Sequence, residues 1–213
     1  TVEWVSTEHN CDLFFFLQGL YRLTGKGHYK TVAEETARGL VSGWSDSISQ
    51  MGRGRDRESA DSTESLDCAS WGSIFLRSAG HAEKAGISLE TCSGYALEYE
   101  GQRGYRPYRN MLVYEGSFIN SKMYPDKPLM NWNDMPMLWH EGSLGVAMAF
   151  IKAGRMEEAK AVIDSVIAFQ NPGGGIPYSS LSVPFQFTKD ESVASAAWLV
   201  MAVSAFENPE VRE

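Results

Sequence analysis

Four segments of the chain are apolar almost all round when drawn as helices, and each follows a short polar stretch that contains an acidic residue. A helix without a polar face is expected in the middle of a packed array. If the four helices point the same way, their acidic starts gather at one rim. We predict these inner helices at residues 11–24, 64–79, 139–153 and 190–206.

Three further segments carry apolar residues at three- and four-residue steps, with charged residues between them, which is typical of an outer helix with one wet face. Each follows an inner helix after a glycine, as at Gly25, Gly80 and Gly154. The repeat predicts an all-α fold, an (α/α) toroid-like array of helical hairpins with about seven helices in an incomplete ring. The outer helices are expected at residues 26–44, 81–100 and 156–170.

Two connections between these helices are long. Residues 45–62 are rich in glycine, serine and charge, and we expect an extended loop with a short strand near 48–51. Residues 101–136 form a long loop rich in aromatic residues. Loops of this length are uncommon in a compact domain and are usually functional where they occur.

The chain of 213 residues is long enough for one domain, and we expect a single hairpin-repeat domain over 1–213 that is part of a larger toroid. The last inner helix has no outer partner, so its apolar surface is expected to be covered by the missing remainder of the toroid or by a second copy in a homo-oligomer. Because the chain starts at Thr1 without a methionine, it is expected to be processed or excised from something longer.

A formal net charge of −8 argues against nucleic acid as a partner, since that binding depends on clustered positive charge. No apolar run approaches the roughly 20 residues that cross a bilayer, so no membrane is predicted. Cys11, Cys68 and Cys92 lack the pair spacing of a metal site, and Cys11 and Cys68 are expected to be buried free thiols. We predict neither a metal nor another cofactor.

Several motifs together resemble the six-hairpin glycosidase superfamily, the (α/α) toroids of carbohydrate-active enzymes. The resemblance rests on STEHN followed by CDLFFF, on LDCASWGSIFL, on WHEGSLGVAMAFIKAG, and on GGIPYSS followed by ESVASAAWLVMA. It implies a site in the toroid mouth, at the starts of the inner helices, and an activity on an oligo- or polysaccharide. The last segment also resembles inner helices of terpenoid cyclases and prenyltransferases, but a DxDD-type acid and a zinc-ligand set are absent from the sequence.

Glu8 and Glu141 are the leading catalytic candidates, because each stands at the start of an inner helix beside a histidine. Hydrolysis of a glycosidic bond needs one carboxylic acid to protonate the leaving oxygen and a second carboxylate as nucleophile or base. Acidic residues at helix starts are also favoured by the helix dipole and by capping alone. His9 and His140 are candidates for base or sugar-hydroxyl ligand, or for a structural bond to a loop carbonyl.

The aromatic loop supplies candidates for sugar contact, since pyranose C–H faces pack against rings whose polar atoms remain free to bond. The alternative is that these rings only pack the loop onto the helices. Arginines among them could bind a sugar carboxylate, and Asn10 at the first helix start either caps that helix or binds substrate. The substrate-binding candidates are His9, Asn10, Tyr105, Arg106, Arg109, Trp132 and Trp139, with Tyr108 and Tyr114 as further candidate rings.

The main hypothesis is a glycoside hydrolase that uses Glu8 and Glu141. A polysaccharide lyase acting on a uronic-acid polymer is the first alternative, with Tyr108 or His140 removing the proton next to the sugar carboxylate. The second alternative is a helical module that binds a glycan or a protein without catalysis.

Overall fold

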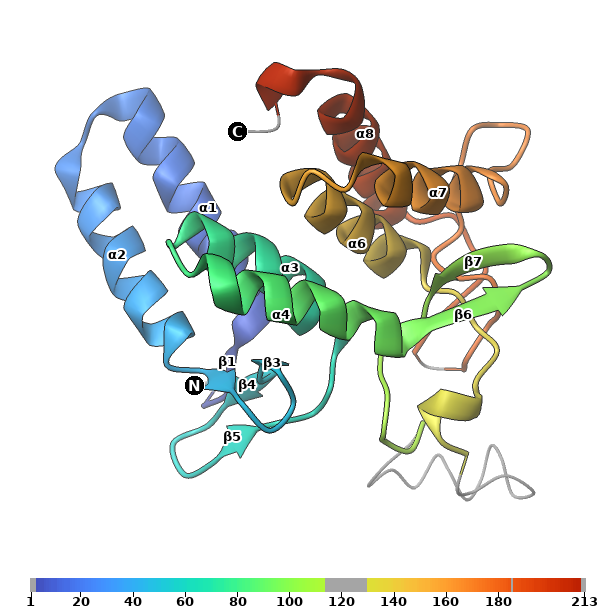
Figure 1. Cartoon of the computed structure of the whole chain (residues 1–213), viewed down its shortest axis with the longest axis horizontal. Helices are drawn as coiled ribbons and strands as arrows, with labels where there is room; N and C mark the ends of the chain where they lie inside the picture. Colours follow the sequence, from blue (N-terminus) through green and yellow to red (C-terminus); the bar gives the residue numbers. More distant parts are fainter. Residues whose placement is uncertain (1–2, 114–129, 185, 212–213) are drawn as a thin grey trace. The chain divides into compact units, whose positions relative to one another are not determined.

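The computed structural model describes residues 3–113, 130–184 and 186–211 (Figure 1). The chain forms two compact units, Thr1–Thr91 and Cys92–Glu213, called unit 1 and unit 2 below, and each is described by itself. Seven α-helices and several short strands make up the described part of the chain. The predicted fold class, an (α/α) array of helical hairpins, is confirmed. The prediction of one domain stays a prediction.

Unit 1 contains two helical hairpins. Helix α1 packs against α2, α3 packs against α4, and α1 also contacts α3 (Figure 1). Gly25 ends α1 with φ +67°, and its N–H donates to the carbonyl of Tyr21, so this turn needs the left-handed backbone that glycine adopts without strain. The helices are α1 Thr7–Thr24, α2 Gly27–Val41, α3 Leu66–Ser78 and α4 Ala82–Thr91.

Helix α1 begins four residues earlier than predicted. Neither Asn10 nor Asp12 caps it, because Ser6 is the N-cap and its hydroxyl accepts a hydrogen bond from the backbone N–H of His9. Asn10 lies inside the helix and donates from its side chain to the carbonyl of Ser6 at 2.7 Å. The polar residues before the apolar run are therefore the first turn of α1.

Short strands fill the loop after α2. A three-stranded antiparallel sheet has the order β1-β4-β5, and β2 pairs with β3. A Cβ at Gly54 would lie 2.4 Å from the carbonyl oxygen of Val5, so the close approach of β1 and β4 requires glycine. The bounds are β1 Val5–Ser6, β2 Trp44–Ser45, β3 Gln50–Met51, β4 Gly54–Arg55 and β5 Ala60–Asp61.

Unit 2 contains the hairpin of α6 and α7, and α8 packs mainly on α6. The predicted outer helix over 81–100 is wrong beyond Thr91, because a 3₁₀ helix and strand β6 replace it. Strands β6 and β7 form a hairpin whose turn residues Glu100 and Gly101 both have positive φ, as a two-residue turn of this kind requires. The elements are η1 Cys92–Tyr95, β6 Ala96–Tyr99, β7 Gln102–Tyr105, η2 Trp132–Asp134, α6 His140–Lys152, α7 Met156–Ile167, α8 Val193–Glu207 and η3 Pro209–Val211.

Burial separates the inner helices into two pairs. Helices α3 and α6 are buried along most of their length, as predicted, and phenylalanines from α1 and α3 meet edge to face in the unit 1 core. Helix α1 leaves Phe16 61% and Leu23 86% exposed, and α8 leaves Val193 88% and Val200 66% exposed. The prediction that all four are enclosed is therefore wrong for α1 and α8 in the described chain, although the predicted uncovered surface on α8 is observed.

Two glycine substitutions, one inside α1 and one at its C-cap, are expected to change stability in opposite directions. Gly25→Ala should lower the free energy of unfolding by about 1–2 kcal/mol, because alanine is strained at a left-handed φ. Gly19→Ala should raise it by about 0.5–1 kcal/mol, since the added methyl meets no atom within 4 Å and alanine favours a helix interior. Urea unfolding of the two variants and the wild type measures both effects, and equal signs would contradict the assigned end of α1.

Candidate active site

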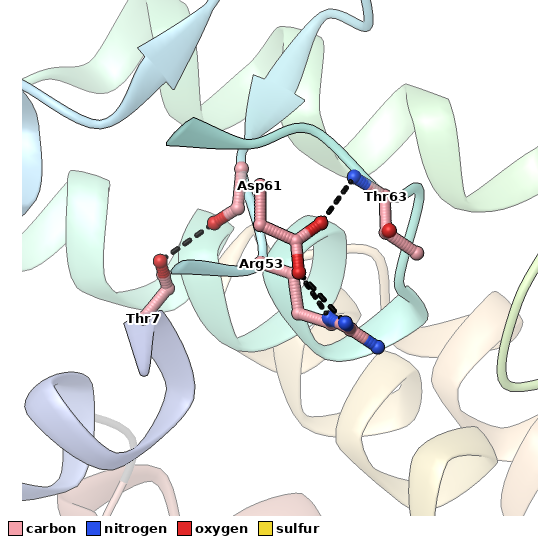
Figure 2. Close-up of polar contacts among 5 residues, drawn as sticks. Thr7, Arg53, Asp61 and Thr63 are labelled. Atoms are coloured by element: carbon pink, nitrogen blue, oxygen red, sulfur yellow. Dashed lines mark hydrogen bonds and ion pairs between the residues drawn. The ribbon is translucent and has the colours of Figure 1, made fainter. Parts of the chain in front are cut away.

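The start of α1 is fixed to the sheet of unit 1. The hydroxyl of Thr7 donates to the carbonyl of Gly52 at 2.6 Å (Figure 2). The backbone N–H of Thr7 also donates to the carbonyl of Arg53 at 3.0 Å. Glu8 is the next residue, so its backbone belongs to a helical turn that is held on one side by the sheet. Glu8 is half-buried, whereas His9 is exposed.

The start of α3 is fixed in a similar way by Gln50, which is fully buried and donates from its side chain to the carbonyl of Ser65 at 2.9 Å. Asp67 is the second residue of α3, as Glu8 is of α1. The two helices are joined by a hydrogen bond from the indole of Trp71 to the carboxylate of Asp12 at 2.9 Å. The first turns of α1 and α3 carry Glu8 and Asp67, and Asp12 follows in the second turn of α1. These three carboxyl groups, Glu8, Asp12 and Asp67, are called the acidic end below.

Burial is the largest influence on the pKa of Glu8 and on the pKa values of the two cysteines near it. It raises the pKa of Glu8, and the negative charge of Asp12 adds to this effect, while His9 opposes it. Burial also raises the pKa of the Cys11 and Cys68 thiols, with further contributions from Asp67 and Glu8 to both. The two thiols stay protonated and act as small apolar side chains, as predicted for buried free cysteines.

Half-burial distinguishes the acid at the second position of three inner helices from the acids in the first turns of α4 and α7. Glu8, Asp67 and Glu141, each the second residue of an inner helix, are half-buried. Glu83, in the first turn of α4, is exposed, and so are the two acids in the first turn of α7. No group of His, Cys, Asp and Glu in the described residues is arranged to hold a metal ion.

An ion pair beside α1 engages one of the arginines of the loop. Arg53 contacts the carboxylate of Asp61 through two nitrogens, at 2.9 and 2.7 Å, and the backbone N–H of Thr63 donates to the other carboxylate oxygen (Figure 2). Burial acts against ionisation of Asp61, but these hydrogen bonds outweigh it and lower its pKa. Arg53 is thereby engaged in holding the sheet.

In unit 2, the start of α6 is held by two extended segments. The backbone N–H of Trp139 donates to the carbonyl of Tyr105 at 2.8 Å, and that of His140 donates to the carbonyl of Tyr178 at 3.1 Å. The His140 side chain is fully buried, and its Nδ1 lies 2.8 Å from the carbonyl oxygen of Pro177. Burial lowers the pKa of His140, which favours the neutral ring, and its Nε2 has no partner among the described residues.

The aromatic candidates of unit 2 pack mainly on one another. Trp132 is fully buried, and both it and Trp139 contact the ring of Phe187 edge to face. Tyr105 is 5% exposed, and burial raises its pKa to about 12. The half-buried rings of this cluster are Tyr108, Tyr178 and Phe187, and of these only Tyr108 was predicted from the sequence. Tyr114 lies outside the described residues.

The two candidate arginines of unit 2 are engaged in the loop itself. Arg106 donates through one nitrogen to the backbone carbonyls of Trp132 and Asn133, and burial lowers its pKa. The guanidinium of Arg109 lies over the ring of Tyr95, 5.1 Å from its centre. Their contact with substrate stays a prediction, as do the roles of the other predicted site residues.

The structure thus places Glu8, His9 and Asn10 in the first turn of one helix of unit 1, and the other predicted site residues that it describes in unit 2. Sequence reasoning did not select Asp12 or Asp67 as site residues. A signal for Asp67 was present, because an acid follows the first residue of each of the segments TEHN, LDCA and HEGS.

Comparisons with known proteins identify a fold neighbour. The structure is similar, with a TM-score of 0.66, to the crystal structure of a possible member of the GH105 family from Salmonella enterica serovar Paratyphi A, at 10% sequence identity. The match covers 96% of this chain and 56% of that chain. At this identity the likeness shows the fold alone, and it agrees with a helical, toroid-like array.

Sequence comparisons do not identify a family. No family model matches the chain. A formate–tetrahydrofolate ligase from Hyphomonas neptunium is 26% identical over 117 residues, which span 54% of this chain and 19% of the ligase. None of the described helices has the length and apolar character needed to cross a membrane.

We expect Glu8→Gln to stabilise the protein at pH 7. A raised pKa means that the folded state holds the Glu8 proton more strongly than the unfolded state, so the wild type loses stability as the pH rises from the ordinary value of 4.5 through the folded pKa. Glutamine does not titrate, so the variant should gain on the wild type between pH 4.5 and 7. Urea unfolding at several pH values measures the difference.

Glu83→Gln is the matched control, because Glu83 is an exposed acid in the first turn of an outer helix. It should lose only the dipole interaction and be destabilised by about 0.3–1 kcal/mol at pH 7. A Glu8→Gln variant that is destabilised to the same extent would show that Glu8 serves the helix dipole.

Proposed function

We propose that the chain is a carbohydrate-active enzyme that hydrolyses a glycosidic bond, with its chemistry at the acidic end. The observation that carries this proposal is the set of half-buried carboxyl groups at the starts of α1 and α3, one of which, Glu8, has a raised pKa. Glycoside hydrolysis uses two carboxyl groups in different states, one protonated to act as acid and one ionised.

Glu8 is the proposed general acid. Burial keeps its proton at a higher pH than in water, which is the property required of the group that protonates the leaving oxygen. Asp67 is the proposed second carboxylate, because it occupies the same position on the neighbouring helix of unit 1. Glu141, the second carboxylate predicted from the sequence, is the alternative for this role.

The proposed partner is an oligo- or polysaccharide. The fold likeness to a possible GH105 member supports this at a coarse level. For unit 2 taken by itself, the half-buried rings Tyr108, Tyr178 and Phe187 are proposed to contact sugar faces, because a ring must keep part of its surface accessible to do so. The predicted contacts of His9, Asn10, Tyr105, Arg106, Arg109, Trp132 and Trp139 with the sugar are kept as part of the same proposal.

The chain spans 56% of the length of its structural neighbour. The proposal that it is part of a larger toroid, or pairs with a second copy, rests on the exposed apolar residues of α8, such as Val193 and Val200. Either partner would bury these residues.

Hydrolysis is tested by incubating the purified chain with a panel of oligosaccharides and measuring new reducing ends. We expect Glu8→Gln and Asp67→Asn each to lower kcat/KM by about 10²-fold or more, because each removes a proton donor or acceptor from the reacting bond. Glu141→Gln distinguishes the two candidates for the second carboxylate. Glu83→Gln is the control and should retain wild-type activity, because Glu83 is an exposed acid of an outer helix.

The products decide between the alternatives. Reducing ends with an unsaturated, ultraviolet-absorbing sugar would identify a lyase and overturn hydrolysis. Saturable glycan binding without either product, unchanged in Glu8→Gln, would identify a binding module. Activity of Glu8→Gln and Asp67→Asn within about threefold of wild type would contradict the assignment of the acidic end.

A further inference from the structure

A pocket of about 460 Å³ lies in unit 1 between the start of α1, the end of α2 and the sheet β1-β4-β5. Its volume falls in the range of about 300–1,000 Å³ that is usual for small-molecule sites. None of the three carboxyl groups of the acidic end lines it. Residues that characterise its wall are Asn10, Leu40, Trp44, Arg55 and Ser62. The pocket is therefore separate from the proposed catalytic groups.

Most polar groups in the wall already have partners within the protein. The hydroxyl of Thr7 donates to Gly52, and the Asp61 carboxylate is engaged by Arg53 and Thr63. The carbonyls at the end of α2 are also satisfied, because the hydroxyl of Ser42 donates to Gly39 at 2.6 Å and Gly43 N–H donates to Leu40 at 2.8 Å. These groups have little capacity left for a ligand.

Arg55 is the exception. Arg53, Arg55 and Arg57 alternate along the loop between α2 and α3. Arg53 pairs with Asp61, and the guanidinium of Arg57 lies 3.9 Å from the carboxylate of Glu3. The Arg55 guanidinium makes no ion pair or hydrogen bond with any residue that the structure describes, and it lines the pocket. A guanidinium offers several donors in a planar arrangement that matches a carboxylate.

The indole of Trp44 provides a flat apolar wall that two contacts orient. Its Nε1 donates to the carboxylate of Asp46 at 2.6 Å, and the ammonium of Lys84 lies 5.2 Å from a ring centre. Leu40, which is buried, lines the same pocket. The pocket thus combines an aromatic wall with a cation that has no partner among the described residues, and the carboxylate of Asp61 in its lining is paired with Arg53.

We propose that this pocket binds a small organic carboxylate with a flat apolar body, with the carboxylate on Arg55 and the body against Trp44 and Leu40. This site goes beyond the proposed hydrolysis, because it neither uses the acidic end nor depends on it. The positive charge selects the acid, and the indole and the leucine select the body.

Phenylacetate is the probe, and phenylacetamide is its neutral counterpart of nearly the same shape. Calorimetric titration of the whole chain should show saturable binding of phenylacetate and at least about tenfold weaker binding of phenylacetamide, because the charge-assisted hydrogen bonds are lost. Inorganic phosphate, an anion without an apolar body, should not compete with phenylacetate at equal concentration.

Two variants locate the site. Arg55→Gln should weaken phenylacetate by about tenfold or more and leave phenylacetamide unchanged. Arg57→Gln is the matched control, since Arg57 is an exposed arginine two residues away that does not line the pocket, and it should change neither affinity. Gly39→Leu should weaken both probes without unfolding α2, because position 39 lines the pocket and a Cβ there meets no atom within 4 Å.

The proposal is overturned if phenylacetate does not saturate below about 10 mM, or if Arg55→Gln and Arg57→Gln bind it equally. Competition by inorganic phosphate with phenylacetate at equal concentration would show a simple anion site and would also overturn it. Thermal unfolding of each variant confirms that lost binding is not lost folding. The Glu8→Gln variant separates this proposal from the proposed hydrolysis. It should lose hydrolytic activity and bind phenylacetate with wild-type affinity.

Discussion

The constraint on which the described structure depends is the attachment of inner-helix starts to extended backbone. The first N–H groups of a helix have no partner within the helix and must find one elsewhere. In α1 the N–H of Thr7 donates to Arg53, in α6 that of His140 donates to Tyr178, and before α8 that of Ser192 donates to Ile176. This hydrogen bond to extended backbone recurs in both units, so it is a feature of the repeated hairpin.

This attachment determines what the next side chain can do. A helix start that is bonded to a sheet does not fray, so the second residue of the helix has a fixed backbone. That residue is Glu8 in α1 and Glu141 in α6. In α3 it is Asp67, and there the side chain of Gln50 holds the carbonyl of Ser65 just before the helix. A group that transfers a proton must be held within a fraction of an ångström of its target, and rigid elements achieve this better than loops.

Periodicity was sufficient to predict the hairpins, because each glycine turn and each change from an all-apolar to a one-sided pattern is a local signal. It was insufficient for the strands, since pairs such as Gly54–Arg55 are strands only through their partners. The segment Ala96–Tyr99 fits a helical stripe equally well, and the positive φ at Glu100 that turns it into a hairpin has no strong sequence mark. Tertiary pairing decided these elements.

The candidate site was predictable to the same extent. Glu8 was found because a local motif precedes an apolar helix, but the proximity of Asp12 to α3 depends on the bond from Trp71, which joins residues 59 positions apart. The burial of Trp132 and Trp139 was equally inaccessible, because an aromatic residue in a loop has the same sequence signature whether it packs inward or faces a ligand. Long-range contacts, which a periodic pattern does not encode, select between the two.

The helix dipole explains why acids occur at helix starts but not why some of them are half-buried. A carboxylate interacts well with the dipole while exposed, as Glu83 shows on α4. Burial works in the opposite direction, because it raises the pKa of Glu8 and so weakens the very charge that the dipole favours. The half-buried Glu8 therefore costs stability that an exposed acid would not, and such a cost is characteristic of residues placed for chemistry.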